Sequence, residues 1–422
     1  MKHYMKLIAI LAVLFTMLAM LTLTACQTGM PTEGETKPAF VNPHSIETGD
    51  CLVHTLENDV CTTCGWEYQV SEGLEIGVDT YSGQYLVLGR GECTDTQIYL
   101  PSTHEGNTVM GVAIGAFTGD ETLTHVVIPE GMTVIGDSAF SRCNRLVSVE
   151  LPTTVQTLNR ALFEGCFRLT SVNLPEGITS IPDSLFSGCS SLKSITIPST
   201  VTNLHGWAFK KCLRLTEITI PEGVTEIGNG AFEGCRDLTT LYLPTTLTTL
   251  SGTTFKDCGS LTDVHYSGNI AQWCSVRIDF QDASPTMLAE NFYVDGARIE
   301  GDITLPEGIT AIGSFTLAGL RNVTSVTVPA SVASIGDNAF KDCEKLAYLV
   351  LQGSTHAGSN PFPNTAVKHI YLTDTREDAL SYIAYWAGAC TFSFSTRVTS
   401  STATAASATS VKLGYWLAPS KI

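Results

Sequence analysis

Four potential metal ligands lie close together near the N-terminus of this 422-residue chain: Cys51, His54, Cys61 and Cys64. They follow the pattern C-x2-H-x6-C-x2-C, and Gly65 comes directly after them. Two ligand pairs of this spacing let a short loop present four groups tetrahedrally to zinc, and a glycine permits the tight turn after the second pair. We therefore expect one structural zinc in residues 50–66. A disulfide among the three cysteines, or no special role, are the alternatives.

No catalytic motif accompanies this cluster. The sequence has no G-x-S-x-G, H-E-x-x-H or G-x-x-x-x-G-K-[ST] pattern, and no G-x-G-x-x-G after a predicted strand. Four protein ligands would leave a bound zinc without an open position for water. The nine histidines are scattered along the chain. The sequence therefore favours a protein that is not an enzyme, with a zinc-dependent activity of the N-terminal segment as a remote alternative.

The charge balance is acidic. The chain carries 41 Asp and Glu against 24 Lys and Arg, a formal net charge of −17. Binding to a phosphate backbone needs a basic stripe, and none is visible along the sequence. We therefore expect no nucleic-acid partner. The low share of charged residues, 15%, suits a fold rich in β-structure and turns better than a bundle of charged helices.

The N-terminus has the features of an export signal. Lys2 and Lys6 precede an apolar run from Leu7 to Leu23, which ends in the sequence L-T-A-C at Cys26. A charged start, an apolar middle and a small-residue cleavage site describe a secretory signal peptide, here residues 1–25. The ending resembles the lipobox of bacterial lipoproteins, which implies that Cys26 carries the lipid that anchors an exported protein to the membrane. An uncleaved membrane anchor is the alternative.

A 23-residue period dominates the rest of the chain. Prolines recur at this spacing at Pro129, Pro152, Pro175, Pro198, Pro221 and Pro244. Phenylalanines recur at Phe117, Phe140, Phe163, Phe186, Phe209, Phe232 and Phe255. Cysteines follow three residues later at Cys143, Cys166, Cys189, Cys212, Cys235 and Cys258. The period returns downstream as Pro306, Pro329, Phe340 and Cys343.

One unit, from Pro221 to Leu243, cannot bury its own apolar side. Its last residues, Leu238-x-x-Leu241-x-Leu243, end in the alternation of a short strand with one buried face. Stacking in register lets each coil cover the next. The period therefore predicts a repeat solenoid of the leucine-rich type with one short parallel β-strand per coil. The cysteines are expected to form an unpaired buried ladder, with disulfides as the alternative.

The pattern P-x-x-V-T-x-I-x-x-x-A-F-x-x-C-x-x-L-x-x-I resembles the BspA-type leucine-rich repeats of bacterial surface proteins. The resemblance covers residues 112–266 and 305–351. Asp120 and Ala318 stand where a cysteine is expected, and Phe315 precedes Phe340 by two residues more than the period. The resemblance implies a cell-surface protein that adheres to host matrix proteins or to other bacteria. Composition and spacing do not show this.

The other segments are assigned around the repeats. Residues 26–49 are expected to be a flexible tether, 67–111 an N-terminal β cap, and 267–304 an insertion with longer strands and a short helix around Trp273. The insertion is expected to be structural, with a ligand-contacting protrusion as the alternative. The strand Val367-x-x-Ile370-x-Leu372 is predicted as the C-terminal cap. Residues 373–422 form a tail that is partly of low complexity.

Three side chains stand out on the predicted surface. The outward positions of the strands are mostly small and polar until Tyr242 and His265, which we expect to lie side by side. Trp207 stands where other units carry small residues. Aromatic residues are enriched at binding hot spots, although isolated surface aromatics are common. We therefore expect an adhesin-like module that binds an extracellular protein or polysaccharide. A structural or scaffolding component of the cell envelope without a specific ligand is the alternative, and the oligomeric state is open.

Overall fold

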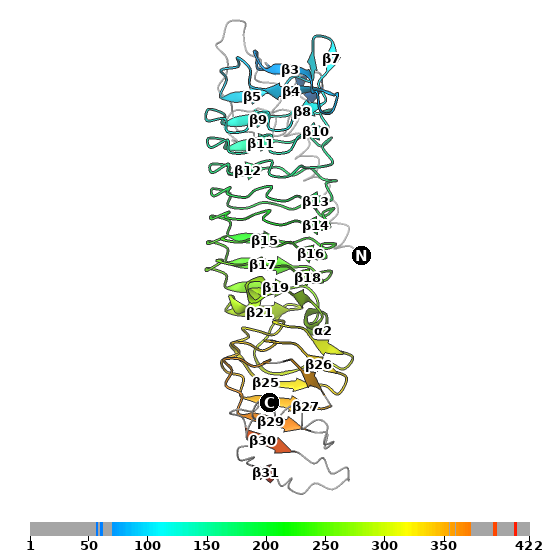
Figure 1. The fold of residues 1–422 in the computed structure, drawn as a ribbon, viewed down its shortest axis with the longest axis vertical. Helices are drawn as coiled ribbons and strands as arrows, with labels where there is room; N and C mark the ends of the chain where they lie inside the picture. The colour runs from blue at the N-terminus through cyan, green and yellow to red at the C-terminus, as the bar shows by residue number, and fades with distance from the viewer. Residues whose placement is uncertain are drawn as a thin grey trace, which may run out of the picture.

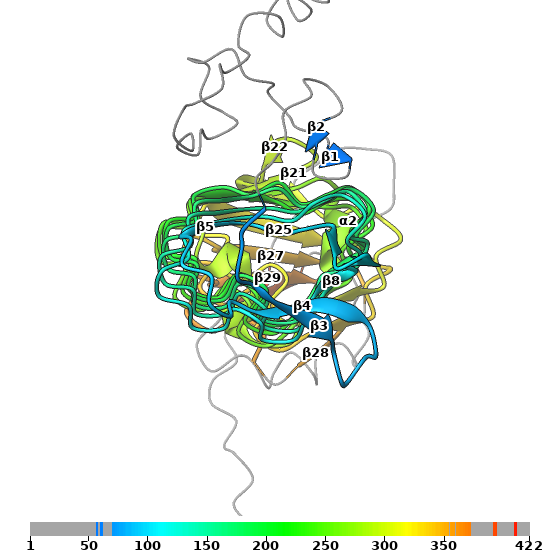
Figure 2. The same cartoon turned by 90° about the horizontal axis from the view of Figure 1, so that it is seen from above.

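The computed structural model describes residues 70–353, 355–358 and 360–372, and the backbone of four short strands at 56–57, 60–61, 391–394 and 409–411. These residues wind into a long stack of coils (Figure 1). Seen along the stack, successive coils superimpose as one rounded outline (Figure 2). The solenoid predicted from the repeat period is confirmed.

Several sequence predictions concern residues that lie outside this description. The proposed lipid-anchor residue Cys26, the tether, and the zinc ligands Cys51, His54 and Cys64 are among them. Cys61 ends strand β2 (Val60–Cys61), whose backbone pairs antiparallel with β1 (Leu56–Glu57). The zinc site and the lipid anchor therefore stay predictions.

Each regular coil contributes to two faces of the stack (Figure 1). Face A comprises the strands that come before the repeat prolines and those that pair with them. Its three sheets are β5 (Gln97–Tyr99), β9 (His125–Val127), β11 (Ser148–Glu150) and β12 (Ser171–Val172); β15 (Glu217–Thr219), β17 (Thr240–Leu243), β19 (Asp263–Tyr266), β21 (Asn291–Val294) and β22 (Ala297–Arg298); and β23 (Gly301–Thr304), β25 (Val323–Val328), β27 (Tyr348–Leu351), β29 (His369–Leu372), β30 (Thr391–Phe394) and β31 (Thr409–Val411).

Face B comprises the strands that follow the prolines and those that pair into the same sheets. Its three sheets are β3 (Glu75–Val78), β4 (Tyr85–Gly89), β8 (Gly111–Val112) and β10 (Val134–Ile135); β13 (Ser180–Ile181), β14 (Asn203–Leu204), β16 (Glu226–Ile227), β18 (Thr249–Leu250) and β20 (Arg277–Ile278); and β24 (Ala311–Ile312), β26 (Ser334–Ile335) and β28 (His356–Ala357). A separate hairpin joins β6 (Thr103–His104) to β7 (Asn107–Thr108).

Face B was missed by the sequence analysis, which predicted one strand per coil. Neighbouring face-B strands pair in parallel, one repeat length apart, as in Glu226↔Thr249 and Ile227↔Leu250. In the regular coils these strands have only two residues, of which one is buried. Two residues are too few to show the alternation by which a strand is recognised in a sequence.

Columns of identical side chains fill the interior between the two faces. The phenylalanine rings from Phe117 to Phe255 stack with centroids 5.4 to 6.0 Å apart. The N–H of each Phe donates to a carbonyl in the next coil, as Phe209 does to Ala231 at 2.8 Å. The coils are therefore joined by ring packing and backbone hydrogen bonds together.

The cysteine ladder is confirmed for the described residues, whose nine cysteines are free and buried. Their environment is less apolar than expected, because the thiols of the repeat donate to carbonyl groups of the preceding coil. Cys166 Sγ, for example, lies 3.0 Å from the carbonyl oxygen of Phe140. Burial raises the pKa of Cys258 and of Cys343 to about 12. These thiols therefore stay protonated and serve packing, since the thiolate is the metal ligand and the nucleophile.

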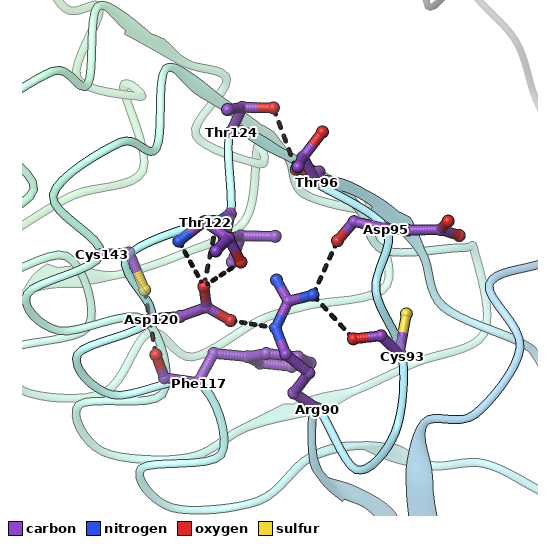
Figure 3. Close-up of polar contacts among 10 residues, drawn as sticks. Arg90, Cys93, Asp95, Thr96, Phe117, Asp120, Thr122, Thr124 and Cys143 are labelled. Carbon is purple, nitrogen blue, oxygen red and sulfur yellow. Dashed lines mark hydrogen bonds and ion pairs between the residues drawn. The ribbon is translucent and has the colours of Figure 1, made fainter.

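The first coil replaces the missing cysteine by an ion pair. Arg90, directly after β4, forms an ion pair with Asp120 and donates from Nη1 to the carbonyl oxygens of Cys93 and Asp95 at 3.0 and 2.7 Å (Figure 3). The other oxygen of Asp120 accepts the N–H and hydroxyl of Thr122, both at 2.8 Å. The departure from the repeat at Asp120 thus fastens the N-terminal cap strands to the first coil.

Asp120→Asn is expected to destabilise the chain by about 2 kcal/mol at neutral pH, because it leaves the Arg90 guanidinium without its charged partner. Burial alone would raise the pKa of Asp120, but the bonds from Arg90 and Thr122 outweigh it and the pKa is lowered. The stabilisation is therefore full above the unfolded pKa of about 3.9 and is lost as the pH falls through the folded pKa. Denaturant unfolding of the wild type and the variant at pH 7 and at about pH 3 measures how much of the destabilisation is lost at low pH. Equal destabilisation at both pH values contradicts it, and Glu121→Gln is the exposed control.

Residues 267–304 form an enlarged coil, and the predicted short helix is present as α2 (Ile270–Cys274). Two short 3-10 helices follow it, η1 (Gln281–Ala283) and η2 (Pro285–Met287). Asp263 on β19 pairs with Asn291 on β21, so this coil is longer than the regular ones. The face-A sheet ends at the hairpin β21–β22, and a new sheet begins at β23. The insertion thus divides the solenoid into two blocks.

Buried side chains of the insertion connect the two blocks. Trp273 is fully buried between Tyr266 and Phe292, with ring centroids 5.1 and 4.9 Å away. Its Nε1–H donates to the carbonyl oxygen of Thr316 in the next coil at 2.5 Å. The buried hydroxyl of Thr286 donates to the carbonyl oxygen of Ala318 at 2.7 Å. These contacts support the structural role expected for the insertion.

The repeat resumes with Leu317, and the assignment of Phe315 to the phenylalanine column was wrong. Leu317 is fully buried, lies one repeat length before Phe340, and accepts the Cys343 thiol at its carbonyl as the phenylalanines do in their coils. The missing cysteine is then replaced by Leu320 and not by Ala318. Phe315 has a φ of 60° and occupies a turn position. Leucine can replace phenylalanine at this position because the position requires a large buried apolar side chain and not an aromatic ring.

The predicted strand at Val367–Leu372 forms as β29, but the sheet does not end there. β30 pairs parallel with β29, and β31 pairs antiparallel with β30. The prediction that Leu372 closes the solenoid was therefore wrong. Part of the segment assigned to the tail extends face A.

Candidate binding surface

Three aromatic side chains stack on face A. Tyr242, His265 and Tyr293 are register partners on β17, β19 and β21. Their ring centroids are 4.7 and 4.4 Å apart, and the planes are nearly parallel at 17° and 7°. All three side chains are partly exposed. The predicted adjacency of Tyr242 and His265 is confirmed, and we call the three residues the aromatic ladder.

A carboxylate lies beside the ladder. Asp263, two residues before His265 on β19, accepts hydrogen bonds from Asn291 Nδ2 at 2.9 Å and from the Thr262 hydroxyl at 2.8 Å. Burial alone would raise the pKa of Asp263, but these bonds, with His265 nearby, outweigh it and lower the pKa. Asp263 is therefore ionised at neutral pH. The ladder is thus flanked by a fixed negative charge.

The stacking decides which atoms of the ladder can meet a ligand. The rings cover one another's faces along the stack, and the Tyr293 side chain also hydrogen-bonds Asp263, so a ligand would meet ring edges and not ring faces. Tyrosine supplies a large apolar contact together with a polar tip, which is why it is enriched at interfaces. The arrangement suits contact with a large, mixed polar and apolar surface.

A second aromatic group lies on face A in the C-terminal block. The ring centroids of Tyr348 on β27 and His369 on β29 are 5.3 Å apart, and Tyr371 lies 6.4 Å from Tyr348. Tyr348 is 44% exposed. Sequence analysis missed both this group and Tyr293. The strict alternation of Asn291–Val294 was the available signal for Tyr293, but its irregular offset from His265 concealed the column.

Trp207 does not belong to the aromatic ladder, because it follows β14 on face B. It is 41% exposed and has a φ of 55°. A Cβ built on Gly230 of the next coil would lie 2.7 Å from Trp207 Cδ1, so the indole covers that glycine. A left-handed conformation is unfavourable for so large a residue. The structure thus separates the three predicted binding residues into one pair and one single side chain.

The described residues hold neither a cluster of metal ligands nor a helix that could span a membrane. In that part of the chain, no three or more His, Cys, Asp or Glu side chains gather as metal ligands would. The same residues contain no helix that is long and apolar enough to cross a membrane. The side chains of the proposed zinc ligands and the apolar N-terminal run lie outside this part of the chain.

Comparisons with solved structures returned leucine-rich repeat proteins. One from Bacteroides ovatus is 25% identical, with 73% of this chain and 71% of that chain covered and a TM-score of 0.48. A leucine rich cell surface protein from Faecalibacterium prausnitzii is 21% identical, with 76% and 98% covered and a TM-score of 0.35. The pneumococcal vaccine antigen PcpA is 14% identical, with 70% and 78% covered and a TM-score of 0.37. No curated protein matches the chain significantly.

A family model identifies the repeats directly. The model described as "BspA type Leucine rich repeat region" matches in six copies, over residues 111–213, 157–275 and 295–387. These segments make up more than half of the 422 residues. Leucine-rich repeat solenoids are typically binding scaffolds and not enzymes. The chain belongs to the family of BspA-type leucine-rich repeat proteins.

Proposed function

We propose that this chain is an exported, non-enzymatic binding protein whose face A attaches to an extracellular protein or polysaccharide. The observation that carries the proposal is the aromatic ladder. The remaining outward positions of the preceding face-A strands are mostly small and polar, such as Ser148, Ser171 and Thr219. A few large aromatic side chains that rise from such a surface are typical of a binding hot spot.

The rest of the proposal concerns how the solenoid is held at the cell surface. The Lys2 and Lys6 start, the apolar run and the L-T-A-C ending support export and a lipid anchor at Cys26. The spacing of the Cys51–Cys64 cluster supports one structural zinc between the anchor and the solenoid. Mass spectrometry of the membrane-extracted chain tests the lipid, and metal analysis tests the zinc.

Replacing Tyr242 or Tyr293 by alanine is expected to weaken ligand binding at least tenfold, which corresponds to about 1.4 kcal/mol per side chain. The ligand is first found by testing the whole chain against a panel of extracellular matrix proteins and polysaccharides. Titration of the variants against that ligand then measures the loss. Tyr81→Ala is the matched control, because Tyr81 is 87% exposed and lies in the N-terminal cap.

Two results would count against the proposal in different ways. If the wild-type chain binds a ligand and both ladder variants bind it equally well, face A is the wrong surface. If the wild-type chain binds nothing in the panel, the alternative of a scaffolding component without a specific ligand is favoured. Trp207→Ala, made in parallel, shows whether the single face-B aromatic contributes.

A further inference from the structure

Stacking of the coils gathers positive charge on one edge of this acidic protein. The edge is the turn between the buried Phe and the buried Leu of each coil. In four consecutive coils these turns, residues 141–145, 164–168, 187–191 and 210–214, contain six basic residues and one acidic residue. The whole chain has 24 basic against 41 acidic residues. The charge of this edge is therefore opposite to that of the molecule.

Five of these cations are exposed and form no ion pair with the described residues. They define what we call the basic edge: Arg142, Arg145, Arg168, Lys211 and Arg214. The sixth, Lys210, pairs with Glu233 at 3.2 Å. The other ion pairs of the described residues lie elsewhere. Glu164 is the one acidic residue of these four turns, so positive charge remains in excess there and suits an anionic partner.

Two of the cations stand at a backbone position that glycine occupies in other coils. Arg142 and Lys211 have φ values of 60° and 57°, whereas Gly165, Gly188 and Gly234 hold the equivalent left-handed position in their coils. A side chain costs about 1–2 kcal/mol there, a cost that glycine avoids. Asp257 and Asp342 take the same conformation at this position in other coils, so the repeat admits charged side chains there and the strain alone marks no cationic site.

The basic residues are held in place by the repeat. A Cβ built on Gly165 would lie 3.3 Å from Arg142 Cγ, and one built on Gly234 would lie 3.3 Å from Lys211 Cγ. Each stem therefore packs over the glycine of the next coil and leaves its charged end in solvent. The pairs Arg142/Arg145 and Lys211/Arg214 occupy the same two positions three coils apart. With about 4.8 Å between strands, that separation is roughly 14 Å.

An aromatic ring lies between the two pairs. Phe167 is 53% exposed, and its Cε1 would lie 3.9 Å from a Cβ built on Gly188, so the ring extends over the coil that carries no charge on this edge. A linear ligand along the edge would therefore meet cations, then an apolar ring face, then cations again. An acidic polysaccharide has the matching order of groups. Its anionic groups would meet the cations, and the apolar C–H face of a sugar ring would meet the Phe167 ring.

We propose that the basic edge and Phe167 bind a linear acidic polysaccharide that carries sulfate or carboxylate groups. A single-stranded nucleic acid fits less well, because successive bases stack on several aromatic side chains, whereas the basic edge offers the one ring of Phe167. The edge is separate from the aromatic ladder, so this proposal and the proposed function can fail independently. The basic stripe was invisible in the sequence because its members are spread over distant coils.

Binding of the full chain to heparin and to polygalacturonate, at about 0.15 M salt, tests this proposal. The variant R142Q/R145Q/K211Q/R214Q is expected to lose at least tenfold in affinity for the polysaccharide that the wild type binds, with a weaker salt dependence. The control R277Q/R298Q/K345Q/K368Q removes the same charge from exposed positions elsewhere and is expected to lose less than twofold. Phe167→Ala is expected to weaken binding about threefold, and Tyr81→Ala, an exposed aromatic of the N-terminal cap, to leave it unchanged.

The proposal is overturned if the wild type binds neither polysaccharide at millimolar concentration, or if the control variant loses as much as the edge variant. Tighter binding of single-stranded DNA than of either polysaccharide overturns the ligand class. Exposed substitutions change stability little, so the edge variant is expected to melt like the wild type. If the edge variant melts at a lower temperature, the single variants R145Q and R214Q, whose positions have ordinary backbone geometry, are titrated in its place. Weaker polysaccharide binding than that of the wild type supports the proposal, and unchanged binding overturns it.

Discussion

Trp273→Ala is expected to lower the free energy of unfolding by about 4 kcal/mol or more and to separate the unfolding of the two blocks. Removal of a fully buried tryptophan usually costs about 3–5 kcal/mol. Here the substitution also removes the Nε1 donor of the buried Thr316 carbonyl, which adds about 1–3 kcal/mol. Because the ring packs on Tyr266 and Phe292, its loss loosens the coil that joins the blocks.

Calorimetry and hydrogen exchange would measure both effects. The wild type is expected to unfold with strong coupling across the insertion, whereas the variant is expected to exchange faster in residues 305–372 than in residues 112–266. Phe280→Ala is the matched control, since Phe280 lies in the same insertion and is 62% exposed. A single transition unchanged from that of the wild type would mean that Trp273 is not what couples the blocks.

The repeat made the interior of the solenoid predictable. Buried positions such as Phe209 and Leu241 recur in coil after coil. Because one coil is too small to bury these side chains by itself, they must pack against the neighbouring coils. Pairing of identical positions then sets the register of face A, which is why Tyr242 and His265 could be placed side by side. Face B was not predictable in this way, because a strand of two residues with one buried side chain shows no alternation.

Irregular coils limited the prediction of the candidate surfaces. Tyr293 completes the aromatic ladder only because the extra residues of the insertion are absorbed in α2 and the 3-10 helices. At Phe315 the residue type was misleading. The phenylalanine column requires a buried apolar side chain, and in this coil the buried side chain is that of Leu317. The basic edge depends on side chains that the repeat leaves free, so no periodic signal marks it. Sequence periodicity therefore predicts the core far better than it predicts the surface.

Phe209→Ala is expected to destabilise the chain by about 3–5 kcal/mol and to loosen the coils on both sides. Phe209 is fully buried, and its ring stacks at 5.5 Å on Phe186 and at 5.4 Å on Phe232, so alanine leaves a cavity shared by three coils. In a solenoid each coil contacts only its neighbours, and a loss in the middle of a block weakens two interfaces at once. Denaturant unfolding of the variant, with the exposed Phe167→Ala as control, measures the effect. If Phe209→Ala is no more destabilising than Phe167→Ala, the phenylalanine column is not what holds the coils together.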